Sequence, residues 1–223
     1  MTEKKNQHYI PKFYLRNFSY QKNKKQIGIF NINNQFFFQT AKLKSQGSKN
    51  FFYGYDGVIE ETLANIEGFL SQTLNEIIES KIIPNKNSDR HIKLLSFITL
   101  TDLRNPIRIE GFKMKLKDMK ENLLKLDPNV DVEKFVPNPT HEEVVELMLS
   151  NFVEMIDFIS DLDYKLLINK TKKPFISSDF PIVKYNQFLE QKKWQHSKSG
   201  FGTVGLQIFV PLNSELTLML ILN

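Results

Sequence analysis

The 223-residue chain contains no cysteine, which excludes disulfide bonds, thiolate catalysis and cysteine-ligated zinc. It has no apolar stretch of the roughly 18 residues that a membrane-spanning helix requires, and its polar first residues do not resemble a secretory signal. These absences predict a cytoplasmic protein without a membrane partner. A hydrophobic content of 41% and a charged content of 25% are typical of a folded globular protein.

Arginine is scarce, because it supplies only four of the thirty basic residues: Arg16, Arg90, Arg104 and Arg108. An arginine kept in so lysine-rich a chain can be required for its planar, bidentate guanidinium, which lysine does not replace. The formal net charge of +5 favours anionic partners, and nucleic acid first among them. The alternative is that the lysines are ordinary solvated surface. Any protein partner and the oligomeric state stay open.

Hydrophobic periodicity predicts a helical centre. Apolar residues recur at spacings of three and four over residues 58–81, and residues 91–104 are apolar almost all round, as in a buried helix. A charged helix is expected to end near residue 126. A capping box formed by Thr140 and Glu143 then begins a helix that we expect to continue to residue 160.

Strand patterns flank this helical centre. Residues 26–31 and 35–40 predict a β-hairpin. Short strands are expected after the helices, at residues 164–169, 175–177, 182–185, 205–210 and 215–222, and the composition of residues 188–192 also fits a strand. This order predicts an α+β fold with an N-terminal β-hairpin, a helical centre and a C-terminal, mainly antiparallel sheet. We expect one domain over residues 1–223, and the apolar last strand suggests that a C-terminal extension is lacking.

Several motifs resemble those of the DUF4238 family, prokaryotic proteins of unknown function. The opening QHYIPKFYLRNF at 7–18 is similar to the family's hallmark, and Glu60 with Glu67 resembles its paired-glutamate helix. The sequences LRNPIR at 103–108 and FISSDFP at 175–181 resemble two further elements. In FVPL at 209–212, Val210 departs from the family's Phe-Pro-Leu, and Thr101 stands where members often carry glutamine. The family's distribution suggests a setting in phage defence or toxicity.

Candidate site residues come from these motifs. His8 is a candidate general acid or base, a metal ligand, or a structural hydrogen-bond donor. Glu60 and Glu67, seven residues apart, share one face of a helix at the edge of its apolar stripe. A half-buried carboxylate there needs an arginine, a metal or backbone donors. The alternatives for this pair are a salt bridge to Arg104 or Arg16, a metal site, or general-base catalysis.

The other candidates lie at the ends of predicted elements. Asp102 and Arg104 end the buried helix, where a charge must be paired, and phosphate binding is the competing role for Arg104 and Arg108. Ser178 and Asp179 follow a predicted strand, where a loop can present side chains to a ligand, although an aspartate there can also cap a turn. A serine hydrolase is disfavoured because no Gly-x-Ser-x-Gly elbow surrounds these serines.

The leading hypothesis is an intracellular phosphodiester hydrolase acting on RNA or DNA. Glu60, Glu67 and Asp179 would bind a divalent ion, Mg²⁺ or Mn²⁺, and share catalysis with His8. Substrate phosphate would be bound by Arg16, Arg104, Arg108 and Ser178. The rival hypothesis is a non-catalytic binding or regulatory module in which the same polar residues form a buried ion-pair network.

Overall fold

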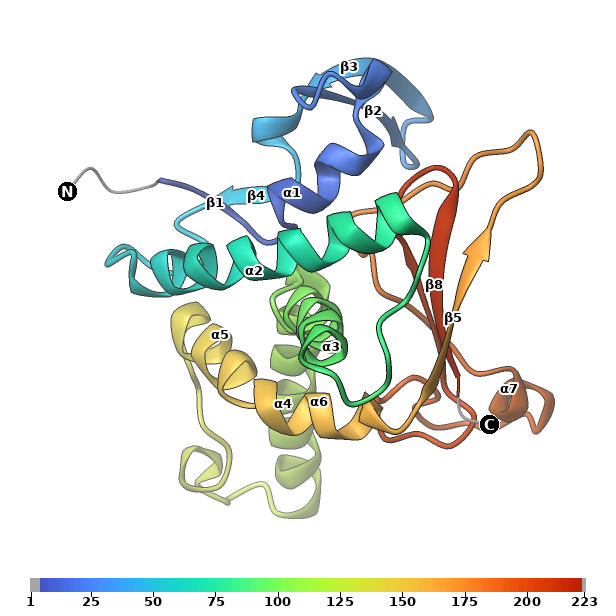
Figure 1. Cartoon of the computed structure of the whole chain (residues 1–223). Helices are drawn as coiled ribbons and strands as arrows, with labels where there is room; N and C mark the ends of the chain where they lie inside the picture. Colours follow the sequence, from blue (N-terminus) through green and yellow to red (C-terminus); the bar gives the residue numbers. More distant parts are fainter. Residues whose placement is uncertain (1–4, 222–223) are drawn as a thin grey trace.

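The computed structural model describes residues 5–221 of the chain and has the predicted α+β architecture (Figure 1). The α-helices are α1 (Lys12–Leu15), α2 (Val58–Ser80), α3 (Asp89–Leu103), α4 (Pro106–Leu126), α5 (His141–Ser150), α6 (Phe152–Ser160) and α7 (Gln187–Gln191). The strands are β1 (Asn6–His8), β2 (Gln26–Asn31), β3 (Phe36–Lys42), β4 (Ser48–Asn50), β5 (Asp163–Ile168), β6 (Val183–Tyr185), β7 (Gln207–Pro211) and β8 (Leu216–Ile221).

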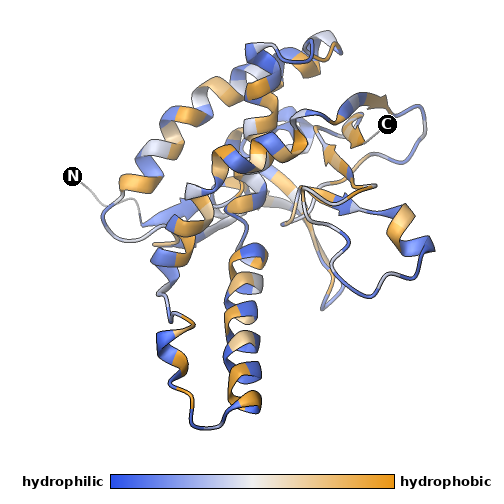
Figure 2. Cartoon of the chain, turned by 90° about the horizontal axis from the view of Figure 1, so that it is seen from below, coloured by the Kyte–Doolittle hydropathy of each residue, from blue (hydrophilic) through white to orange (hydrophobic). Residues whose placement is uncertain are grey.

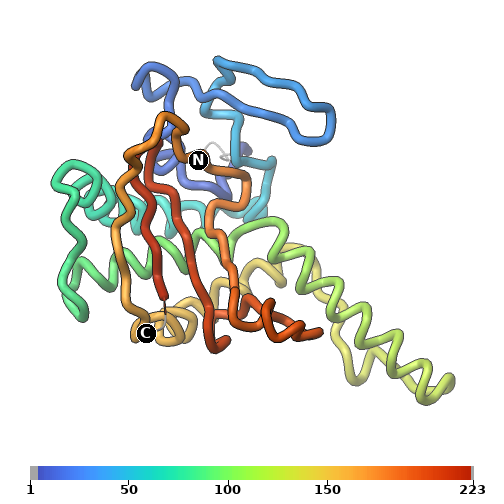
Figure 3. Tube along the Cα trace, turned by 90° about the vertical axis from the view of Figure 1, so that its right-hand side faces the viewer, coloured from blue at the N-terminus to red at the C-terminus, as the bar shows by residue number. Residues whose placement is uncertain are grey.

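The C-terminal strands form one antiparallel sheet in the order β5-β8-β7-β6. Successive side chains of β8 point to opposite faces, so Leu216, Leu218 and Leu220 share the inner face, where all three are buried. Ile208 and Val210 of β7 pair with two of these leucines and so share their face. Figure 3 shows this sheet as a layer in front of the helices. The sheet therefore closes one side of the hydrophobic core.

Helix α3 runs through the centre of the molecule and is buried almost throughout. It packs against α2 and α6, and residues 97–105, at its carboxyl end and just beyond, are all buried. Ser88 caps its first turn by accepting a hydrogen bond from the His91 amide. Helix α4 begins directly afterwards, with Asn105 as its N-cap and Pro106 in its first turn. The charged residues at the end of α3 are thus held inside the protein.

Helix α4 and the segment that returns from it project from the body (Figures 2 and 3). Hydrophobic and hydrophilic residues alternate along this projection, and Ile109, near its base, is its one fully buried helical residue. No helix in residues 5–221 is long and apolar enough to cross a membrane.

The N-terminal strands form two small sheets, β1 with β4 and β2 with β3. The turn before β4 needs a glycine, because Gly47 has a φ of +62° and an added Cβ would lie 2.8 Å from Ile10 Cβ. The Gly47 carbonyl accepts hydrogen bonds from the amides of Tyr9 and Ile10. This contact fixes the start of the opening motif against the loop after β3.

Three local predictions are wrong. The single helix expected over residues 140–160 is divided at Asn151 into α5 and α6, although the capping box at Thr140 and Glu143 is confirmed. Residues 175–177 form no strand. Their main-chain contact with the C-terminal segment is a hydrogen bond from the Phe175 amide to the Ser214 carbonyl. Residues 188–191, considered as a strand, lie in α7, because Asn186 caps this turn by accepting from Leu189 N.

Candidate functional site

Arg104 lies at the carboxyl end of α3 with only 2% of its surface exposed. Its Nη1 donates to Glu67 Oε1 on α2 at 2.8 Å, in a salt bridge whose carboxylate is 25% exposed. The predicted alternative of a structural salt bridge between Glu67 and Arg104 is therefore confirmed. The Nε of Arg104 is buried without a hydrogen-bond partner among the described residues. The guanidinium joins two helices inside the protein and is not directed toward solvent.

Asp102, two residues earlier, is the centre of a second group of charges, which we call the Asp102 cluster. Its side chain is fully buried, and its two oxygens accept from Lys184 Nζ at 2.8 and 2.9 Å. Arg108 Nε lies 3.1 Å from Asp102 Oδ2. Lys184 is on β6 opposite Ile208, so the strand register directs it to the inner face of the sheet. This cluster therefore ties α3 and α4 to the sheet.

The environment of Lys184 supports this assignment. Burial lowers the pKa of its ammonium, Asp102 raises it, and Arg108 lowers it, with a lowered pKa as the net result. Its Nζ also lies 4.7 Å from the centre of the Phe201 ring, within the range of a cation–π contact. A lysine in such surroundings needs the carboxylate of Asp102 to stay charged.

His8 is on β1, next to the region of Arg104, and is only 6% exposed. Burial lowers the pKa of its imidazole to about 4, with smaller contributions from Lys12 and Arg104 and an opposing one from the Lys44 carbonyl. Its Nε2 has no hydrogen-bond partner in the described part of the chain. A group with this pKa is neutral at pH 7, which disagrees with a general base tuned to neutral pH.

The Ser-Ser-Asp loop is joined to the opening motif through Tyr14. The Tyr14 hydroxyl lies 2.8 Å from Ser177 Oγ and donates to the Pro211 carbonyl at 2.8 Å. Tyr14 is fully buried, and burial raises the pKa of its phenol. One side chain thus links three of the motifs that the sequence singled out. No sequence pattern marked this tyrosine as more than a core aromatic residue.

The predicted Ser178 and Asp179 are exposed and act locally. Ser178 Oγ donates to the Phe180 carbonyl and accepts from the Phe180 amide, so this serine holds the turn. The Asp179 carbonyl accepts from Asn105 Nδ2 at 2.7 Å, which anchors the loop to the start of α4. Burial raises the pKa of Tyr9, and the negative charge of Asp179 raises it further.

The predicted residues are thus brought together only in part. Arg104 and Glu67 are in contact, His8 and Asp179 lie near this pair, and Arg16 is exposed at the end of α1. In residues 5–221 no group of three or more His, Asp or Glu side chains is placed to bind a metal ion. The carboxylates of Glu60, Glu67 and Asp179 therefore do not fit a shared Mg²⁺ or Mn²⁺ site, and the divalent ion stays a prediction.

Two structural contacts in this region escaped the sequence reasoning. Lys184 lies in a short strand, and its pairing with Asp102 depends on a long-range register that one sequence does not reveal. Asn105 carried a usable signal, since an asparagine before a proline at a helix start is a typical N-cap. Its side chain both accepts from the Ile107 amide and donates to the Asp179 carbonyl.

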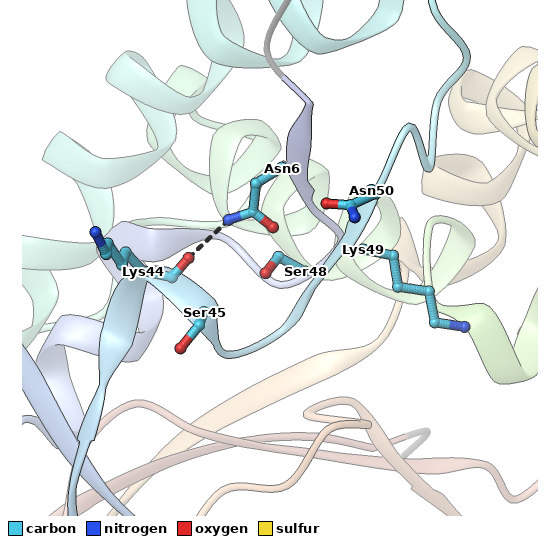
Figure 4. Close-up of a pocket in the computed structure, with 6 residues that line it drawn as sticks. All are labelled: Asn6, Lys44, Ser45, Ser48, Lys49 and Asn50. Atoms are coloured by element: carbon cyan, nitrogen blue, oxygen red, sulfur yellow. Dashed lines mark hydrogen bonds between the residues drawn. The ribbon is translucent and has the colours of Figure 1, made fainter.

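A shallow pocket of about 610 Å³ lies outside this region, in the N-terminal part of the chain. It is lined by Asn6, Lys44, Ser45, Ser48, Lys49 and Asn50 (Figure 4). Asn6 Nδ2 donates to the Lys44 carbonyl at 2.8 Å, whereas the side chains of Lys44 and Lys49 extend away in opposite directions. The pocket contains none of the predicted site residues, and its charged groups do not converge.

Comparison with known proteins identifies one family. The model of the family described as protein of unknown function (DUF4238) matches residues 6–223, which is nearly the whole chain. No curated protein and no solved structure matches the chain. The resemblance to this family is therefore confirmed over residues 6–223.

Proposed function

Because the chain belongs to the DUF4238 family, whose description assigns no activity, we propose its function from its own residues: it is a non-catalytic binding module. The charged residues of its motifs stabilise the fold and position an anion-binding surface elsewhere. The observation that carries this proposal is the burial of Arg104, whose guanidinium is bonded to Glu67 at 2.8 Å. A guanidinium that is enclosed and paired is not available to bind a phosphate.

The Asp102 cluster supports the same conclusion. An aspartate with no exposed surface and two cationic neighbours is a structural ion-pair centre, because removing either partner would leave an uncompensated charge in the core. These bonds join α2, α3, α4 and the sheet. Tyr14 adds the opening motif to the same assembly through its bonds to Ser177 and Pro211.

The phosphodiester hydrolase remains the competing prediction. It requires a proton-transfer group and a set of carboxylates that hold a metal ion. The pKa of His8, near 4, and the dispersed positions of Glu60, Glu67 and Asp179 support it less than they support a binding module.

The test is an incubation of the whole protein with labelled RNA, single-stranded DNA and duplex DNA, each with Mg²⁺, Mn²⁺ or EDTA. We expect every substrate to remain intact. Asp179→Ala is the informative variant, and Asp157→Ala, which removes another exposed carboxylate, is its matched control. Metal-dependent cleavage that is lost in the first variant and kept in the second would replace the binding module with a nuclease.

A further inference from the structure

Charge is distributed very unevenly along the chain. Residues 5–55, which we call the basic segment, contain eight lysines and one arginine but no aspartate or glutamate. Residues 56–223 contain twenty lysines and arginines against twenty-four acids. The net charge of +5 therefore arises entirely from the N-terminal quarter of the protein, since the remainder is slightly acidic.

The cations of the basic segment are available to a ligand. All nine side chains belong to exposed residues, and none forms a salt bridge with a carboxylate in the described part of the chain. Three of them, Lys24, Lys25 and Lys42, lie at the base of the β2–β3 hairpin, where Lys42 pairs with Gln26. The Lys25 carbonyl accepts from the Leu43 amide, which holds the two ends of the hairpin together.

The same hairpin exposes an unusual number of aromatic side chains. Phe30, Phe36 and Phe37 are each 59% exposed, and Phe38 is 47% exposed. Phe30 pairs with Phe37 across the strands, so these two rings share one face. Ile29, next to Phe30, packs toward the core, which directs the Phe30–Phe37 face away from the body. Figure 1 shows the hairpin above α1 and α2, clear of the sheet and the other helices.

The backbone beneath this face fits a flat aromatic platform. An added Cβ at Gly28 would lie 3.4 Å from Phe37 Cε2, so the Phe37 ring rests against β2 where no side chain intervenes. A ring supported in this way presents its other face to solvent. Exposed aromatic rings beside unpaired lysines are the combination that binds single-stranded nucleic acid, because bases stack on the rings and phosphates contact the cations.

A lipid bilayer and a second copy of the chain fit the hairpin less well. Its tip carries Asn31, Asn33, Asn34 and Gln35, whose amide groups would lose their hydration in a lipid bilayer but can hydrogen-bond to bases. A second copy of the chain would bring two basic segments together, and their like charges would repel. The absence of acidic residues from the basic segment thus favours an anionic ligand, and the face formed by Phe30 and Phe37 favours a ligand with flat rings.

We propose that the β2–β3 hairpin binds single-stranded RNA or DNA, with bases stacked on Phe30 and Phe37 and phosphates held by Lys24, Lys25 and Lys42. This names the ligand of the proposed binding module, and it rests on that proposal for the view that the bound strand is not cut. The hairpin itself is separate from the Asp102 cluster and from the Arg104–Glu67 pair.

The test is fluorescence anisotropy of labelled 20-nucleotide U and dT oligomers titrated with the whole protein at several salt concentrations. We expect binding, and the double variant Phe30→Ala/Phe37→Ala should weaken it by about tenfold or more, as loss of a stacking platform does. The matched control Phe69→Ala/Phe135→Ala removes two other exposed phenylalanines and should bind like wild type.

The lysines have their own control. Lys24→Gln/Lys25→Gln/Lys42→Gln should reduce the slope of log K against log salt by about 2, because each phosphate contact on a single strand contributes about 0.7. Lys115→Gln/Lys117→Gln/Lys125→Gln, with the same charge change on exposed α4 positions, should leave the slope unchanged. Circular dichroism of each variant confirms that it is folded.

Several results would overturn the inference. They are an absence of oligomer binding, equal affinity for wild type and the Phe30/Phe37 variant, and binding to vesicles of phosphatidylserine or to polyglutamate but not to the oligomers. Denaturing gels of the same mixtures separate the two proposals. Binding with cleavage would overturn the proposed non-catalytic function and support nucleic acid as the ligand. No binding and no cleavage would overturn only the proposal that nucleic acid is the ligand.

Discussion

The basic segment and the helix-sheet body use charge in opposite ways. In residues 5–55 the cations are exposed and have no carboxylate beside them, whereas in the body Arg104, Asp102 and Lys184 are buried and paired. The motifs that attract attention in the sequence belong mostly to the second group. A charged residue in a conspicuous motif can therefore serve the fold, while a plain run of lysine, asparagine and phenylalanine forms the surface that we propose for a ligand.

The largest expected effect is a loss of stability of the helix-sheet body. Asp102→Ala should lower the free energy of unfolding by about 3–5 kcal/mol, because it leaves Lys184 buried without its carboxylate. For a protein of this size, the melting temperature should fall by roughly 6–20 °C. Guanidinium and thermal unfolding measure both quantities. The exposed Asp179→Ala serves as control and should stay within about 0.5 kcal/mol of wild type. Equal stability of the two variants would contradict the structural role of Asp102.

The next effect depends on pH and concerns His8. The pKa of His8 is about 4 in the folded protein, against the ordinary value of 6.5 for a solvated histidine, so the unfolded chain binds the proton first as pH falls. The stability from His8 is fully present above pH 6.5 and is lost between pH 6.5 and about 4, by up to about 3 kcal/mol. The free energy of unfolding, measured in urea, should fall less steeply between pH 7.5 and 4.5 for His8→Gln than for wild type.

The matched control for this measurement is His196→Gln, because His196 is exposed. Its stability should follow the wild-type curve. Parallel curves for His8→Gln and wild type would show that His8 has no lowered pKa in the folded protein.

A smaller effect is expected where the opening motif meets the Ser-Ser-Asp loop. Tyr14→Phe keeps the ring and removes the hydroxyl that bonds to Ser177 and to the Pro211 carbonyl. The loss should be about 1–2 kcal/mol, because the carbonyl is left without this donor. Tyr20→Phe, at a half-buried tyrosine with no side-chain hydrogen bond recorded among the described residues, is the control. A loss below about 0.5 kcal/mol for Tyr14→Phe would remove this residue from the account.

The smallest effect on stability is expected in the basic segment. Phe30→Ala/Phe37→Ala should change the free energy of unfolding by less than about 1 kcal/mol, since both rings are mostly exposed. The same variant should weaken binding of oligonucleotides strongly. A large loss of stability would mean that these rings belong to the core and would make their exposure irrelevant to a ligand.

The sequence predicted the architecture well where the pattern is local and repetitive. The apolar stripe of α2, the capping box of α5 and the apolar run of β8 each specify an element through neighbouring residues. Residues 188–191 misled the prediction, because the cap supplied by Asn186 outweighs the strand-like composition. Local rules fail where one side-chain hydrogen bond decides between two structures.

One contact among the candidate site residues was predictable from the sequence, and another was not. Helical spacing placed Glu67 at the edge of the apolar stripe of α2, and Arg104 was one of the two arginines predicted as its salt-bridge partner. The pairing of Asp102 with Lys184 depends on the register of β6 against β7, which is set by contacts distant in sequence. The basic segment could have been found in the sequence by following the charge from one segment to the next, because the net charge of the whole chain conceals it.

The central claim, that the motif charges hold the fold, is tested most directly by a double-mutant cycle on Arg104 and Glu67. The free energies of unfolding of wild type, Glu67→Ala, Arg104→Met and the double variant would be measured in guanidinium. We predict that Glu67→Ala is destabilised by about 3 kcal/mol, since it leaves a buried guanidinium unpaired, and that the coupling energy exceeds about 1.5 kcal/mol. A coupling energy within about 0.5 kcal/mol of zero would contradict the claim.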